Sequence, residues 1–198
     1  MELKNISKSF GEKAVLRDLS CVFPVGVTCV LGPSGCGKTT LLKLLAGLES
    51  PDSGEILGLE GKKISAVFQE DRLFDDLSAE RNVLITARRG FTRVDARALL
   101  DSLGLTDAAK RVRDMSGGMK RRVAIARALA ADHDLLLLDE PCAGLDSATR
   151  ETVLQVIRTA CAGRICVCVT HDPKDVERLG AAALHLPEGR VVSPLPAR

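Results

Sequence analysis

Aromatic residues are scarce in this chain. Tryptophan and tyrosine are absent, and phenylalanine alone supplies the 3% aromatic content of the 198 residues. No apolar run approaches the roughly 18 residues that a membrane-spanning helix needs. The start, M-E-L-K-N-I-S-K, lacks an apolar signal segment, so we expect the chain to stay in the cytosol. Acidic and basic residues nearly balance, 26 against 28, which argues against a general nucleic-acid-binding protein.

The seven cysteines form no C-x-x-C pair. Without a secretion signal they indicate reduced thiols and not a disulfide framework. Cys166 and Cys168 alternate with valines, which is typical of one face of a buried strand, although metal binding is the alternative.

A glycine-rich stretch carries the clearest chemical signal. Residues 32–40 read G-P-S-G-C-G-K-T-T, and the spacing of Gly32, Gly37, Lys38 and Thr39 fits a phosphate-binding loop. Such a loop needs backbone N–H groups that point inward, and glycine bends this tightly without a Cβ clash. A buried-strand pattern precedes the loop and a helical pattern follows it, so the phosphates would lie at a helix N-terminus.

Within this loop, Lys38 is expected to reach the β- and γ-phosphates, and the Thr39 hydroxyl to reach Mg²⁺. Cys36 is interpreted as a small filler, with a redox role as the alternative. The candidate nucleotide-binding residues of the loop are Gly32, Pro33, Ser34, Gly35, Cys36, Gly37, Lys38, Thr39 and Thr40.

Residues 135–141, L-L-L-L-D-E-P, predict a strand that is apolar on both faces, as in a covered parallel sheet. Ligands of such sheets bind at the carboxyl ends of the strands, where Asp139 and Glu140 stand. Paired carboxylates are costly to bury unless they serve a cation. We therefore expect Asp139 to attend Mg²⁺ and Glu140 to activate water.

The remaining pattern is α/β. Residues 2–31 look β-rich, and residues 55–69 resemble a hairpin whose second arm ends in Gln69. Residues 78–110 turn helical and more polar, which predicts a small helical lobe. Taken alone, the segment 115–119 is a helix cap or a second anion site, and His171 at a strand end or Phe10 before a turn would be ordinary structural residues.

Together these motifs resemble the nucleotide-binding subunit of an ATP-binding cassette (ABC) transporter over essentially the whole chain. The matching motifs are the Walker A loop at 32–40, the Q-loop glutamine Gln69, the M-S-G-G-M signature at 115–119, the Walker B strand at 135–141, the D-loop A-G-L-D ending in Asp146, and the switch histidine His171.

The resemblance implies a P-loop NTPase fold with a mainly parallel sheet core, an N-terminal antiparallel β subdomain and a small helical subdomain. It implies a single ABC ATPase domain over 1–198. Residues of about 1–76 and 131–198 would form the RecA-like core with the β subdomain. Residues of about 77–130 would form the helical subdomain that carries the signature.

The resemblance also implies a mechanism in which two subunits, a homodimer or a pseudo-dimer with a second ABC subunit, sandwich two ATP molecules. Ser116, Gly117 and Gly118 would act on the ATP of the other subunit. Thr39, Gln69 and Asp139 would attend Mg²⁺, while Glu140 polarises the attacking water and His171 contacts the γ-phosphate. Phe10 falls where the family places an aromatic ring against adenine. A membrane permease would dock on the helical lobe, at the cytoplasmic face of the membrane.

Two departures from the family pattern are Met119, in place of the usual signature glutamine, and Met115, in place of leucine. The segment V-F-Q-E-D-R-L-F resembles importers of the nitrate, sulfonate and taurine type. A soluble ABC ATPase of DNA repair or of ribosomes is the alternative, but such relatives carry long coiled-coil insertions or two cassettes. A nucleotide-dependent interaction module is a third reading, and the presence of Glu140 and His171 argues against it.

Overall fold

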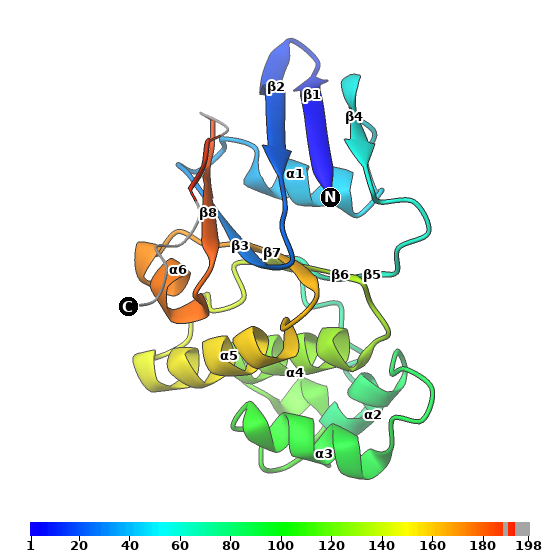
Figure 1. Ribbon diagram of the computed structural model, residues 1–198. Helices are drawn as coiled ribbons and strands as arrows, with labels where there is room; N and C mark the ends of the chain where they lie inside the picture. The colour runs from blue at the N-terminus through cyan, green and yellow to red at the C-terminus, as the bar shows by residue number, and fades with distance from the viewer. Residues whose placement is uncertain (188–189, 193–198) are drawn as a thin grey trace.

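The computed structural model describes residues 1–187 and 190–192, and it contains two β-sheets. The smaller sheet is antiparallel in the order β2-β1-β4. Its strands are β1 (Glu2–Phe10), β2 (Lys13–Val22) and β4 (Ser53–Leu57). In Figure 1 this sheet lies at the top, above α1 (Lys38–Leu45).

The larger sheet has the order β5-β6-β7-β3-β8-β9 and is parallel except for the last strand, which pairs antiparallel with β8. Its strands are β3 (Gly26–Leu31), β5 (Ile64–Val67), β6 (Leu135–Asp139), β7 (Ile165–Val169), β8 (Ala182–His185) and β9 (Arg190–Val192). The α/β class with a mainly parallel core is therefore confirmed.

Helices cover the sheet on the side away from the antiparallel strands (Figure 1). Next to it lie α4 (Gly117–Ala130) and α5 (Ser147–Ala160), and further out lie α2 (Ala79–Leu84) and α3 (Arg93–Ser102). A 3₁₀ turn, Val112–Asp114, leads into α4, and α6 (Pro173–Leu179) leads into β8. Among the described residues, no helix is both long and apolar enough to cross a membrane.

Side-chain caps fix where these helices begin, because they satisfy backbone N–H groups that have no intrahelical partner. Thr92 and Asp95 form a reciprocal capping box at α3. Single caps are provided by Ser78 at α2, Ser116 at α4, Asp146 at α5 and Asp172 at α6.

The larger sheet separates two hydrophobic cores. Leu135 and Leu137 of β6 pack with α1 and the antiparallel sheet, whereas Leu136 and Leu138 pack with α4, α5 and the helices beyond them. All four leucines are fully buried, as the four-leucine run predicts. The alternation follows from the two-residue period of a strand.

The predicted hairpin at 55–69 is wrong. Its first arm, β4, pairs with β1, and its second arm, β5, pairs in parallel with β6. The Lys63 amide donates to the carboxylate of Asp134 at 2.9 Å, which anchors β5 beside β6. The polar turn at 60–62 therefore passes between two sheets, because β6 offers the apolar partner that β5 needs.

Candidate functional site

A pocket of about 290 Å³ opens at the carboxyl ends of β3 and β6. It brings together residues from the phosphate loop, the Q-loop and the end of β6, although they are far apart in the sequence. The lining residues are Lys13, Val15, Ser34, Gly35, Gly37, Lys38, Thr39, Thr40, Gln69, Asp139 and Glu140.

The loop conformation requires glycine at two of its positions. Gly35 and Gly37 have φ values of 78° and 103°, which side-chain-bearing residues rarely adopt. A Cβ at Gly37 would also lie 2.8 Å from the side chain of Leu16. Gly37 is the N-cap of α1, so the loop delivers the helix N-terminus to the pocket.

Lys38 is held across the loop. Its Nζ donates to the carbonyl oxygens of Gly32 at 2.8 Å and of Pro33 at 2.9 Å. These bonds hold one positive charge at a residue that lines the pocket, where an anion would be attracted.

Thr39 and Asp139 meet on the floor of the pocket, where the Thr39 hydroxyl donates to Asp139 Oδ2 at 2.8 Å. Burial raises the pKa of Asp139, the nearby charge of Glu140 raises it further, and the Thr39 hydrogen bond opposes both. A hydroxyl and a carboxylate are the oxygen ligands that Mg²⁺ prefers. Gln69 lines the same pocket, so the residues present fit a magnesium ion.

Glu140 lies at the pocket edge next to His171, with 3.7 Å between Glu140 Oε2 and His171 Nδ1. Its backbone is left-handed, with φ of 50°, and its amide donates to the carbonyl of Val169 at 3.0 Å. Neighbouring strands β6 and β7 thus bring the glutamate and the histidine together.

A buried network supports the segment that carries His171. Thr170 donates its hydroxyl to Asp175 at 2.6 Å, and Arg150 donates to both carboxylate oxygens of Asp175 at 2.8 and 2.6 Å. These residues were not singled out from the sequence. The polar run T-H-D-P-K-D at 170–175 was the available signal.

Nine predicted site residues do not line this pocket: Phe10, Gly32, Pro33, Cys36, Ser116, Gly117, Gly118, Asp146 and His171. Phe10 is 47% exposed at the end of β1, with Lys8 Nζ 5.4 Å from its ring centre. Ser116 accepts from the Met119 amide at 3.4 Å, and Asp146 accepts from the Ala148 and Thr149 amides. Within a single chain, Ser116 and Asp146 act as helix caps.

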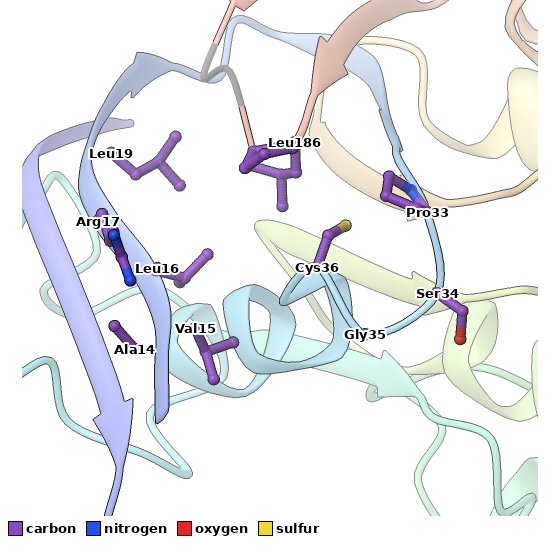
Figure 2. A pocket seen from close by; sticks show the side chains of 11 residues that line it. Ala14, Val15, Leu16, Arg17, Leu19, Pro33, Ser34, Gly35, Cys36 and Leu186 are labelled. Atoms are coloured by element: carbon purple, nitrogen blue, oxygen red, sulfur yellow. The ribbon is translucent and has the colours of Figure 1, made fainter. Parts of the chain in front are cut away.

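Cys36 faces a second pocket, of about 500 Å³, that lies between β2, the loop and Leu186 (Figure 2). A Cβ at Gly32 would lie 2.8 Å from Cys36 Sγ and 2.5 Å from the Leu186 carbonyl oxygen. The phosphate loop therefore packs closely against Leu186 at Gly32, with no room for a side chain there.

Sequence analysis missed Arg121. This arginine of α4 is 6% exposed, and its guanidinium donates to the carbonyl oxygens of Phe68 and Glu140. Arg121 lies three and seven residues before Ala124 and Ala128, which are buried on the apolar face of α4. A basic residue at this helical spacing was the signal available in the sequence.

Comparison with known proteins agrees with this geometry. Residues 16–143 match the family model described as "ABC transporter". The thiamine import ATP-binding protein ThiQ of Mesorhizobium japonicum is 38% identical, with 98% of this chain and 83% of that protein covered. The intermembrane phospholipid transport protein MlaF of Escherichia coli is 34% identical, with 98% and 81% covered.

Solved structures agree as well. The dimeric cassette MJ0796, described as a post-hydrolysis state bound to ADP and Pi, has a TM-score of 0.83 and 31% identity over 99% of each chain. The family match covers more than half of this sequence, and the phosphate loop and the β6 carboxylates occupy one pocket. The chain therefore belongs to the ABC transporter family, as an ATP-binding cassette that hydrolyses ATP.

Proposed function

We propose that this ATPase drives a membrane importer. Its ATP site is the pocket of about 290 Å³ at the carboxyl ends of β3 and β6. One observation carries the proposal: Lys38, Thr39, Gln69, Asp139 and Glu140 share that pocket. The curated relatives include import ATP-binding proteins for thiamine, aliphatic sulfonates and taurine.

In this proposal the loop amides and Lys38 hold the phosphates, and Phe10 lies against adenine. Thr39, Gln69 and Asp139 hold Mg²⁺, which would neutralise charge on the phosphates when bound. Glu140 polarises the attacking water, and His171 contacts the γ-phosphate. Most of the rate enhancement then comes from positioning and electrostatic stabilisation.

We further propose that residues of about 77–130 form a lobe separate from the core at about 1–76 and 131–198. Ser116, Gly117 and Gly118 of this lobe would bind the ATP held by a second subunit, next to the partner's D-loop with its Asp146. Three observations support this arrangement. Ser116 and Asp146 lie outside their own chain's pocket, both are exposed, and the similar cassette MJ0796 is dimeric.

Ser116→Arg is expected to abolish the ATP-dependent dimer, because a bulky side chain would fill the anion pocket that the start of α4 provides. The measurement is size-exclusion chromatography with and without ATP. It uses the Glu140→Gln background, in which bound ATP should persist.

Met119→Gln in the same background is the matched control. The Met119 backbone amide lies at the start of α4, as Ser116 does, but the Met119 side chain need not reach the phosphates. We therefore expect only a modest change in the lifetime of the dimer. If Ser116→Arg dimerises like its parent, the segment 115–119 is only a helix cap.

We also propose that the membrane permease docks on the lobe at about 77–130. The chain would then lie at the cytoplasmic face of the membrane. Two large apolar side chains are exposed on this lobe: Ile85 is 52% exposed at the end of α2, and Val94 is 75% exposed on α3. Phe74, which is 52% exposed, lies just before the lobe begins. A contiguous exposed apolar patch marks a protein interface, and we propose that these residues contribute to one.

Ile85→Asp is expected to release the membrane partner, because an aspartate would be desolvated in an apolar interface. The test is co-purification of the tagged chain from detergent-solubilised membranes, with the integral membrane protein identified by mass spectrometry. Leu48→Asp is the control, since Leu48 is 64% exposed but follows α1. Equal recovery with Ile85→Asp would remove Ile85 from the interface. If the parent recovers no membrane protein, the soluble alternative is favoured.

A further inference from the structure

Arg121 is a buried cation between two segments of the site. Its side chain is 7% exposed in the second turn of α4, and its Nε has no hydrogen-bond partner within the described part of the chain. It also lines a cavity of about 260 Å³ shared with Gln69 and Glu140. Burying a charge is costly unless the charge is paired and hydrogen-bonded, so the partners of Arg121 indicate what it does.

One nitrogen of the guanidinium binds the Q-loop. Nη1 donates to the Phe68 carbonyl at 2.5 Å and to Asp71 Oδ1 at 2.9 Å. These two residues flank Gln69, which lies in the ATP pocket. Arg121 thereby binds a backbone carbonyl before the glutamine and a side-chain carboxylate after it.

The other terminal nitrogen binds the end of β6. Nη2 donates to the carbonyl oxygen of Glu140 at 3.1 Å and also to that of Asp139. A planar guanidinium with donors on both sides can hold two segments at a fixed separation, which a lysine ammonium cannot do.

Glu140 needs such support, because its backbone φ of 50° is unfavourable for a residue with a side chain. Strained residues of this kind persist where the surrounding contacts hold them in place. The Glu140 amide is held by Val169, and its carbonyl accepts from Arg121 and from the Ala143 amide at 3.1 Å. Removing Arg121 would leave the Ala143 amide as the remaining donor to the Glu140 carbonyl among these contacts.

We propose that Arg121 is a positioning residue for ATP hydrolysis, which links the Gln69 segment to the Glu140 backbone and sets the direction of the glutamate side chain. The inference rests on the role of Glu140 in the proposed function. Arg121 does not line the pocket proposed for ATP, so we expect it to act on turnover and not on nucleotide affinity.

The test compares Arg121→Gln and Arg121→Lys with the parent. Both variants should lower kcat by about 10–100-fold, since a displacement of about 1 Å at a reacting group costs up to 10²-fold. The Kd for ATP, measured with a fluorescent analogue, should change by less than about 3-fold. Lysine should fail to rescue, because it keeps the charge and loses the fork.

Arg122→Gln is the matched control. The neighbouring Arg122 also donates to backbone carbonyls, at 3.1 Å to Gly118 and at 3.0 Å to both Leu103 and Gly104, but it contacts neither the Q-loop nor β6. Its kcat should stay near the parental value. A loss equal to that of Arg121→Gln would reduce Arg121 to general support of α4 and overturn the proposal.

A double-mutant cycle separates positioning from stability. If Arg121 acts through the Glu140 carboxylate, Arg121→Gln should cause no further loss of residual hydrolysis in the Glu140→Gln background, measured in single turnover. Additive losses would overturn the inference. If the Arg121 variants do not fold, Asp71→Ala removes the acceptor at 2.9 Å and should lower kcat without changing the Kd for ATP.

The cycle also distinguishes the two hypotheses. A Glu140→Gln variant with parental turnover would contradict the proposed function itself. A slow Glu140→Gln variant together with parental kcat in Arg121→Gln would overturn only the role of Arg121.

Discussion

Glu140→Gln is expected to lower kcat for ATP hydrolysis by about 10²–10⁴-fold, the usual worth of a general base. Glutamine keeps the size of the side chain and its oxygen acceptor but cannot take the proton from water. Asp139, Thr39 and Gln69 are untouched, so binding of ATP with Mg²⁺ should persist. Phosphate release under saturating ATP gives kcat, and a fluorescent ATP analogue gives Kd.

Glu151→Gln is a suitable control, because Glu151 is an exposed glutamate on α5 that pairs with Arg178 at 2.9 Å. It should hydrolyse ATP at the parental rate. Parental turnover in Glu140→Gln would instead move the water-activating role to another group, and His171, 3.7 Å away, would be the first to examine.

Lys38→Ala is expected to weaken ATP binding by about 30-fold to several thousand-fold. Truncating one member of a buried, hydrogen-bonded charge pair costs about 2–5 kcal/mol, and each 1.4 kcal/mol is about tenfold in affinity. Besides losing that charge, the loop would lose the bonds to the Gly32 and Pro33 carbonyls. Titration with the fluorescent analogue measures the change.

Lys43→Ala controls for the removal of a positive charge from the same helix, because Lys43 is exposed in the last turn of α1. Its ATP affinity should match that of the parent. Unchanged affinity in Lys38→Ala, with the protein folded, would mean that the glycine-rich loop is not the phosphate site.

The fold was predictable where local patterns were unambiguous. The four-leucine strand can only be buried on both faces, and the loop glycines at 35 and 37 adopt the positive φ values that their motif requires. The hairpin failed for the opposite reason. The segments at 53–57 and 64–67 both favour strands, and their partners are chosen by tertiary contacts that local sequence does not encode.

The site was predictable to a similar degree. Six of the nine loop residues at 32–40 line one pocket together with Gln69 and the β6 carboxylates, but spacing alone gives no distances. Arg121 escaped notice because basic residues on a helix usually face solvent, and its burial depends on the Q-loop folding over α4. The roles of Phe10, Ser116 and Asp146 stay predictions, since they depend on a nucleotide and a second subunit.

The division of the interior into two cores has a mechanical consequence. The phosphate loop and α1 belong to the core shared with the antiparallel sheet, while α4 and the outer helices belong to the other. Because the parallel sheet separates them, we expect that a tilt of the outer helices would repack the second core and leave the core around the phosphate loop unchanged. An ATPase that drives movement needs a rigid nucleotide site and a second region that can move. Regions of a protein that open independently of one another commonly provide this combination.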